Sequence, residues 1–291
     1  MKTTAGTKII DGLIYLFIAI ASLTCLVPFL HVFALSLSSN AAVMSQKVHV
    51  LPVEFSLEAY RQVIGDPSMI RSLLNTIFVT VLFTVIGLIL TLCAAYPLTK
   101  KHLKGRTVFS FLFLFVMYFN AGIIPDYLLM NQLNLLNSLW SLIWPLAFST
   151  YNMIIMKAFI QSTIPDSLEE SAFIEGCSHI GVLIRIIIPL CKPVLATLCL
   201  FYAVGRWNAY QDSLYYITKQ NLYVLQHKLS LLINTASDSS SIAQEVQSTT
   251  ILTPEVLKAA CIMFATIPII IVYPFLQRYF VKGMMLGAVK G

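Results

Sequence analysis

The stretch "IPDSLEESAFIEGCSHIGVLIRIIIPLCKP", residues 164–193, lies between two strongly apolar parts of the chain. It holds four acidic groups close together, Asp166, Glu169, Glu170 and Glu175. We call this charged, glycine-containing stretch the elbow segment. What this segment does depends on the environment of the whole chain, because the rest of the chain contains few charged residues.

The composition is that of an integral membrane protein. Of the 291 residues, 58% are hydrophobic and only 11% are charged, with a mean hydropathy of +0.81, whereas a soluble domain carries about 25% charged residues. Such a chain cannot cover its surface with polar groups, so lipid must be its solvent. The net charge of +6 does not indicate a nucleic-acid partner, because the Lys and Arg residues cluster beside apolar runs on alternate loops.

Six apolar segments are long enough to cross a bilayer, which needs about 20 residues per span. Backbone groups in lipid must be satisfied internally, so each span is expected to be a helix of an all-α protein. The first apolar run exceeds the usual signal-peptide core and is expected to be an uncleaved span. The chain is predicted to be one transmembrane domain, 1–291, with spans at about 12–37, 72–99, 108–124, 139–156, 193–216 and 259–277.

The charge distribution predicts the orientation in the plasma membrane. With both termini in the cytoplasm, the inner segments hold twice as many Lys and Arg residues as the outer segments, and "KKHLKGR" at 100–106 is the densest cluster. The elbow segment is then cytoplasmic. An outer loop at about 217–254 contains "NLYVLQHKLSLLI" (221–233), whose leucines have the spacing of an amphipathic helix.

The elbow segment reads as two short helices joined at a glycine. Ser167 and Glu170 have capping-box spacing, and Gly176 can supply the left-handed residue that ends the first helix. Ser178 can cap a second helix, which Pro189 is expected to end. On these residues alone, the acidic groups either form a functional contact or merely cap a helix and solvate a loop. A DNA-binding helix-turn-helix is disfavoured, because phosphate repels the acidic first helix.

The segment "EESAFIEGCSHIGVLIRIIIPLCKP" resembles the EAA loop of ABC importer permeases, a cytoplasmic motif of about 30 residues before the penultimate helix. The Glu-Ala-Ala and Asp-Gly-Ala positions of that motif are occupied by Glu170, Ser171 and Ala172, and by Glu175, Gly176 and Cys177. The stretches "NTIFVTVLFTVIGLILTLCAAYPLTKKHLKGR", "FNAGIIPDYLL", "LFYAVGRWNAY" and "YPFLQRYFVKGMMLGAVKG" are similar to MalG-type sugar permeases, in particular their LplC-like branch.

The resemblance implies the six-helix type I ABC importer fold, in which the EAA loop is a coupling element that docks on an ATPase. It implies four kinds of partner: a second permease subunit, two ATPase subunits, an extracellular solute-binding protein and the bilayer. Seven residues are candidates for ATPase coupling: Glu169, Glu170, Ser171, Ala172, Glu175, Gly176 and Cys177. Glu170 is the first candidate for a polar contact to the ATPase.

The chain itself lacks the motifs of a hydrolase. It contains no G-x-x-x-x-G-K-[ST] phosphate loop and no HExxH helix, and its five histidines have no metal-ligand spacing. We therefore expect a translocation subunit that is not an enzyme and holds no metal or cofactor of its own. ATP and Mg²⁺ are expected on the partner ATPase.

The segment 193–216 is the most polar of the spans, and polar groups in a span usually face a cavity or another helix. The candidates for a substrate path are Arg206, Trp207, Asn208, Tyr210, Gln211, Asp212 and Tyr215. In a continuous helix, Asn208, Asp212 and Tyr215 share one face, and Arg206 lies on another with Tyr210. Arg206 either pairs with a substrate carboxylate, which favours acidic sugars, or is a structural residue that bonds helix-terminal carbonyls or an acid.

These observations predict an ATP-driven, binding-protein-dependent importer of sugars or oligosaccharides, complex or acidic ones among them, that works by alternating access. Two alternatives stay open. An importer of amino acids, peptides or anions shares the EAA loop, and an ion-driven secondary transporter belongs to a different class.

Overall fold

In the computed structural model, every regular element among the described residues is a helix, and a single antiparallel bridge pairs Ser38 with Phe55. The structure describes the backbone of residues 5–119, 121–238 and 252–288, and the side chains of 10–119, 121–234 and 252–274. The chain forms two compact units. The first comprises Met1–Ile70 with Leu229–Ile267, and the second Arg71–Lys228 with Pro268–Gly291.

The first unit is organised around the apolar helix α1. Its own helices are α1 (Ala5–Ser36), α2 (Asn40–Met44) and α3 (Glu58–Gly65). The Tyr60 hydroxyl lies 2.8 Å from the Ser36 hydroxyl and joins α3 to the end of α1. The backbone N–H of Thr253 donates to the Asn40 side chain at 2.7 Å. In its apolar window α1 has no buried residue within the chain, so this helix turns its side chains toward lipid or a partner.

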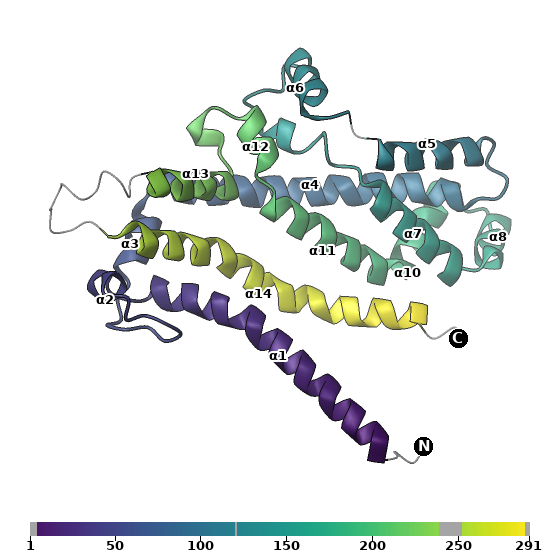
Figure 1. The fold of residues 1–291 in the computed structure, drawn as a ribbon. Coiled ribbons are helices and arrows are strands. Elements are labelled where there is room, and N and C mark those ends of the chain that lie inside the picture. The colour runs from purple at the N-terminus through teal and green to yellow at the C-terminus, as the bar shows by residue number, and fades with distance from the viewer. Residues whose placement is uncertain (1–4, 120, 239–251, 289–291) are drawn as a thin grey trace. The chain divides into compact units, whose positions relative to one another are not determined.

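The second unit is built along the helix α4. Its elements are α4 (Pro67–Thr99), α5 (Arg106–Tyr118), α6 (Ile123–Gln132), the 3₁₀ turn η1 (Leu139–Leu142), α7 (Thr150–Thr163), α8 (Asp166–Ile174), α9 (His179–Val182), the π-helical turn η2 (Leu183–Ile187), α10 (Ile188–Leu190), α11 (Lys192–Asn208), α12 (Gln211–Tyr216) and the 3₁₀ turn η3 (Gln220–Leu222), with parts of α13 (Leu225–Asp238) and α14 (Pro254–Ala288). Figure 1 shows α5, α7 and α11 arranged along α4. Their shared core includes Leu98, Met156, Ile160, Val182 and Leu198.

α4 and α11 pack tightly against each other at Gly87. A Cβ atom at Gly87 would lie 2.9 Å from the Ala147 carbonyl oxygen and 2.9 Å from the Tyr202 ring. One turn further along α4, the Thr91 hydroxyl lies 2.7 Å from the Tyr202 hydroxyl, which also accepts the backbone N–H of Ser149 at 3.1 Å. Small residues and interhelical hydrogen bonds are what hold helices together in lipid.

Three of the six predicted spans are confirmed as long apolar helices. The helices that are long and apolar enough to cross a membrane among the described residues are Ile10–Ser36, Pro67–Thr99 and Pro254–Pro274. Two bent helix pairs, Arg106–Tyr118 with Ile123–Gln132 and His179–Leu190 with Lys192–Asn208, raise the number to five if each is one span. The last predicted span, 259–277, ends in residues whose side chains lie outside the described part.

The other three predicted spans are not continuous helices. The segment 108–124 ends as a helix at Tyr118, and a new helix starts at Ile123 and runs through Pro125 and Asp126, because proline and an acidic residue are both favourable in a first turn. The segment 139–156 is a 3₁₀ turn, then non-helical backbone around Pro145, then α7. The segment 193–216 breaks at residues 209–210.

We predict that Gly87→Ala destabilises the protein by about 1–3 kcal/mol, because the added methyl group overpacks the contact with backbone and ring. Thermal unfolding of the purified chain in detergent measures this change. Gly205→Ala on α11 is the matched control, since a Cβ there meets nothing within 4 Å and alanine stabilises a helix interior by about 1 kcal/mol relative to glycine. Equal unfolding temperatures for the two variants would contradict the packing argument.

Candidate functional site

The elbow segment begins with α8, whose start differs from the prediction. Pro165 is the N-cap, and no side chain caps this helix. Ser167 is already inside the helix, so it cannot serve as an N-cap, and its carbonyl accepts the Ser171 hydroxyl at 2.9 Å. The predicted capping box of Ser167 and Glu170 is therefore wrong. Asp166 occupies the first turn, where a carboxylate is favoured by the helix dipole.

The predicted glycine elbow is confirmed. Gly176 has φ +86°, a left-handed conformation that side chains other than glycine rarely adopt. The N–H of Gly176 donates to the Phe173 carbonyl and that of Cys177 to the Ala172 carbonyl, at 3.0 and 2.9 Å. This pair of bonds is a Schellman motif, which satisfies the last carbonyls of α8. Ser178 then caps α9, as predicted, by accepting the N–H of Gly181 at 3.1 Å.

The second helix of the elbow segment does not end where the sequence predicts. It continues beyond Pro189 to Leu190, through a π-helical turn at Leu183–Ile187. A proline inside an α-helix clashes with the carbonyl four residues earlier, and the wider π turn directly ahead of Pro189 removes that clash. An 80° bend then separates His179–Leu190 from α11.

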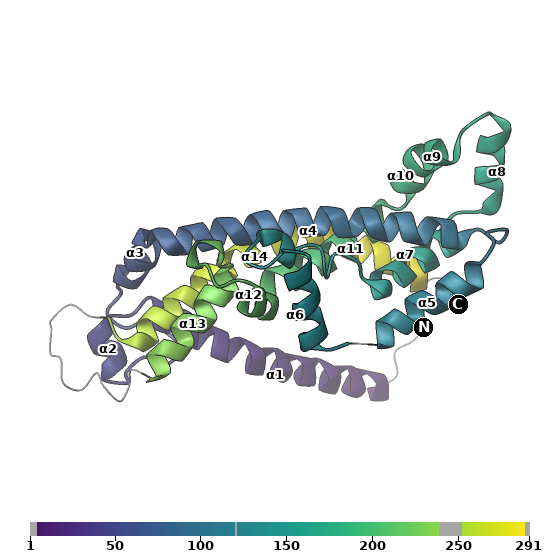
Figure 2. The same ribbon diagram turned by 90° about the horizontal axis from the view of Figure 1, so that it is seen from above.

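The coupling candidates divide between an exposed and a buried side of the elbow segment. Figure 2 shows α8, α9 and α10 projecting beyond α4 and α7. Glu169 and Ala172 are buried against the rest of the unit, and Cys177 is half-buried. The large apolar side chains of Ile174 and Ile180 are 87% and 68% exposed. Exposed polar and glycine candidates accompany them: Glu170, Ser171, Glu175 and Gly176.

The buried side of α8 holds an ion pair that the sequence reading missed. The Glu169 carboxylate is paired with the Lys100 ammonium at the end of α4, and it accepts the Tyr96 hydroxyl at 3.0 Å. A second, exposed ion pair joins Lys101 to Asp166 at 3.2 Å. No local pattern reveals these contacts, because each joins residues more than sixty positions apart.

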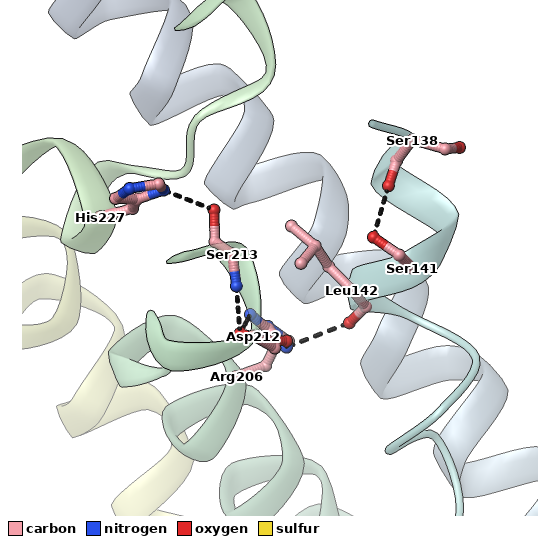
Figure 3. A network of polar contacts seen from close by, with 7 residues as sticks. All are labelled: Ser138, Ser141, Leu142, Arg206, Asp212, Ser213 and His227. Carbon is pink, nitrogen blue, oxygen red and sulfur yellow. Dashed lines mark hydrogen bonds and ion pairs between the residues drawn. The ribbon is translucent and has the colours of Figure 1, made fainter. Parts of the chain in front are cut away.

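The polar candidates of the span 193–216 belong to a buried network (Figure 3). Arg206 is only 3% exposed, and its two terminal nitrogens bind the two carboxylate oxygens of Asp212. Nη1 also donates to the Leu142 carbonyl at 3.0 Å. A bidentate arginine–carboxylate pair is strong and geometrically specific, so this contact fixes the break between α11 and α12.

The network continues from Asp212 to α13. The backbone N–H of Ser213 donates to the Asp212 carboxylate at 2.9 Å, and the Ser213 hydroxyl lies 2.9 Å from Nδ1 of His227. Burial lowers the pKa of the His227 imidazole, while the Asp212 charge acts in the opposite direction.

The helix predicted within the loop 217–254 is present as α13, which begins at Leu225. Residues 239–251 of that loop lie outside the described part.

The predicted division of the candidates between two helix faces is wrong. It assumed a continuous helix, whereas the break at residues 209–210 turns Asp212 toward Arg206. Five of the seven candidates line one cavity of about 580 Å³: Asn208, Tyr210, Gln211, Asp212 and Tyr215. The other two candidates line different cavities. Trp207 lines an almost wholly apolar cavity of about 360 Å³, and Arg206 lines another.

The cavity of about 580 Å³, called the polar cavity below, combines aromatic rings with planar polar groups. Its other lining residues include Asp126 and Tyr216, which sequence reasoning did not select. Asp126 was read as the end of a span, and only the new helix α6 places it at the cavity. Two carboxylates line the polar cavity: Asp212, which is paired with the Arg206 guanidinium, and Asp126.

Comparisons with known proteins agree on one family. Residues 105–286 match the family model of binding-protein-dependent transport system inner membrane components. The polygalacturonan/rhamnogalacturonan transport system permease protein YtcP of Bacillus subtilis (strain 168) is 40% identical over 98% of this chain and 99% of its own length. Protein LplC of the same organism is 40% identical over 100% of this chain and 98% of its own length.

A solved structure gives the same result in three dimensions. A chain in the crystal structure of a bacterial ABC transporter involved in the import of the acidic polysaccharide alginate matches with a TM-score of 0.86 and 33% identity. The match covers 96% of this chain and 99% of that chain.

We predict that Asp212→Asn destabilises the protein by about 3–5 kcal/mol, because it leaves the buried Arg206 guanidinium without a counter-charge. The double variant Arg206→Met/Asp212→Asn is expected to recover part of this loss, as measured by unfolding in detergent. The control is Asn208→Ala, which removes an exposed amide that bonds only the Val204 carbonyl of its own helix. A double variant as unstable as the sum of its two single variants would show that the pair does not hold the helix break.

Proposed function

We propose that this chain, which belongs to the family of binding-protein-dependent transport system inner membrane components, is the permease subunit through which an ABC importer moves carbohydrate into the cell. As a member of this family it is a multi-pass membrane component and not the ATPase, and it works with an ATPase and a binding protein. Family membership removes the ion-driven transporter from the alternatives.

The lining of the polar cavity is the main argument that the substrate is a carbohydrate. Sugars are recognised by aromatic faces together with planar groups that bond hydroxyls, and this cavity offers Tyr210, Tyr215 and Tyr216 beside Asn208 and Gln211. Its volume of about 580 Å³ is in the range of small-molecule sites. Two similar proteins, a polygalacturonan/rhamnogalacturonan permease and a chain of an alginate importer, support the same substrate class.

The assembly we propose is the one the family resemblance implies. Residues 1–291 form a single permease domain with six membrane-crossing segments, the third, fourth and fifth of them interrupted, and with both termini in the cytoplasm. The chain pairs with a second permease and two ATPase subunits, and receives substrate from an extracellular binding protein. It holds no cofactor itself, since ATP and Mg²⁺ bind to the ATPase subunits.

In the proposed cycle, the elbow segment is the contact with the ATPase. Its projecting side offers apolar groups (Ile174, Ile180) next to acidic ones (Glu170, Glu175), a combination that suits an apolar cleft with a basic rim. ATP-driven closure of the ATPase dimer moves the elbow segments of the two permeases together and opens the pair toward the outside. Hydrolysis and release return it to the inward-facing state.

The assembly is tested by tagging this chain, extracting it in detergent and identifying what copurifies. A second permease and an ATPase are expected, and the purified binding protein is expected to retain an oligosaccharide. Retention of a peptide or amino acid instead would support the alternative importer class. Recovery without any ATPase would contradict the proposed assembly.

We predict that Tyr210→Ala and Gln211→Ala each reduce sugar transport about tenfold, as expected when one contact to a bound hydroxylated ligand is lost. Uptake of radiolabelled substrate in reconstituted vesicles gives the rate, and affinity of the binding protein is measured separately because it should not change. Leu214→Ala is the control on the same helix, since Leu214 is exposed and is not among the residues that line the cavity. Equal rates for all three variants would place the substrate path elsewhere.

A further inference from the structure

The contact between α8 and the end of α4 is made through three polar groups in a buried place. Glu169 is 5% exposed and Tyr96 is 7% exposed. The carboxylate of Glu169 binds the Lys100 ammonium and accepts the Tyr96 hydroxyl at 3.0 Å. The same ammonium lies 4.4 Å from the centre of the Tyr96 ring, a cation–π distance. We call these three residues the α4–α8 clamp.

Burying the clamp costs free energy, so its charges are expected to do more than hold α8 against α4. Desolvating two charges offsets most of their attraction, so an apolar contact of the same volume stabilises a fold at least as well. Apolar neighbours already hold α8 in place, since Ala172 packs in the same core as Leu98 and Ile164. The charges fix the position of α8 along α4. The Glu169 carboxylate is bonded at one place on α4, whereas an apolar contact would allow the two helices to slide.

The helix that receives this contact, α4, is linked to the polar cavity through its contacts with Tyr202 of α11. Five residues before Tyr96 along α4, the Thr91 hydroxyl bonds Tyr202 of α11, and Gly87 packs directly on the same ring. Tyr202 lies one turn before Arg206, whose pair with Asp212 fixes the start of α12 at the polar cavity. A displacement of α8 that the clamp passes to α4 therefore reaches the cavity wall through a continuous set of packed and hydrogen-bonded groups.

We propose that Glu169 is a positioning residue for transport: with Lys100 and Tyr96 it makes the elbow segment and α4 move as one body, so that ATPase movement reaches the polar cavity. Its neighbour Glu170 lies on the exposed side, and its side chain forms no ion pair with another described residue, so the two adjacent glutamates have separate tasks. This inference rests on the proposed function, because it assumes an ATPase that moves the elbow segment.

The chain provides a matched control close to each partner, one residue from Lys100 and three residues from Glu169. Lys101 and Asp166 form an ion pair between the same two elements at 3.2 Å, but their side chains are 84% and 70% exposed. Exposed pairs contribute little, because water screens them and their side chains are costly to order. Variants of this exposed pair change the net charge at the same place without touching the clamp.

The test uses the full importer, with its second permease, ATPase and binding protein, reconstituted in vesicles. The clamp variants are Glu169→Gln, Lys100→Met and the exchange Lys100→Glu/Glu169→Lys. The control variants are Asp166→Asn and Lys101→Met. Three quantities are measured for each: recovery of all subunits, ATP hydrolysis with loaded binding protein, and substrate transported per ATP hydrolysed.

We expect Glu169→Gln and Lys100→Met to assemble and hydrolyse ATP, but to lower the substrate transported per ATP by about tenfold, within the range by which residues on a coupling route change coupling. The exchange variant is expected to restore most of the loss, and the control variants to stay within about twofold of the original chain, because their exposed pair contributes little. A purely structural role would lower assembly and leave the ratio unchanged.

Two results would overturn the inference. One is an unchanged ratio in an assembled Glu169→Gln complex. The other is failure of that variant to assemble while Tyr96→Phe, which loses only one hydroxyl, assembles and transports at the original ratio. If the unaltered chain recovers no ATPase at all, the proposed function fails before the clamp is tested, so the two failures are distinguishable.

Discussion

The contact of α4 with α11 at Gly87 and Tyr202 is the constraint on which the second unit depends. Apolar burial does not drive helices together in lipid, because the tails are as apolar as the side chains. Association must come from close packing and hydrogen bonds, and this contact has both: the missing side chain of Gly87 admits the Tyr202 ring, and the tyrosine hydroxyl lies within hydrogen-bond distance of Thr91 and Ser149. The elbow segment and the polar cavity are both positioned by helices that meet there.

Two ion pairs with little exposure to solvent each set a geometry in this unit. Arg206 with Asp212 fixes a helix break, and Lys100 with Glu169 fixes the position of a short helix against a long one. An isolated charge in an apolar medium is costly, and a pair recovers that cost only in one good arrangement. Two pairs on elements that both pack on α4 therefore make the arrangement of those elements specific.

The sequence predicted the class of the protein, its long helices and the elbow, and it failed where the backbone departs from regularity. Apolar length alone predicts α1, α4 and α14 well, and glycine and serine chemistry correctly predicts the turn at Gly176 and the cap at Ser178. The sequence does not reveal the helix break at residues 209–210, because neither Ala209 nor Tyr210 is a helix-breaking residue such as proline or glycine. The pair Lys100–Glu169 joins residues 69 positions apart, so no local pattern contains it, and the polar cavity depends on α6 and α12 meeting after two such breaks.

The pairing of Lys100 with Glu169 has a consequence for biogenesis. In the proposed orientation, the "KKHLKGR" cluster is the strongest signal that holds this loop on the inner side during insertion. Glu169 leaves the ribosome 69 residues later, roughly 3 to 14 s at ordinary rates of synthesis, so the ammonium is unpaired during the interval in which topology is decided. Once the later segment arrives, the same group loses its role as a signal to the insertion machinery and becomes part of the folded interior. One side chain thus serves two successive purposes, separated in time by the order of translation.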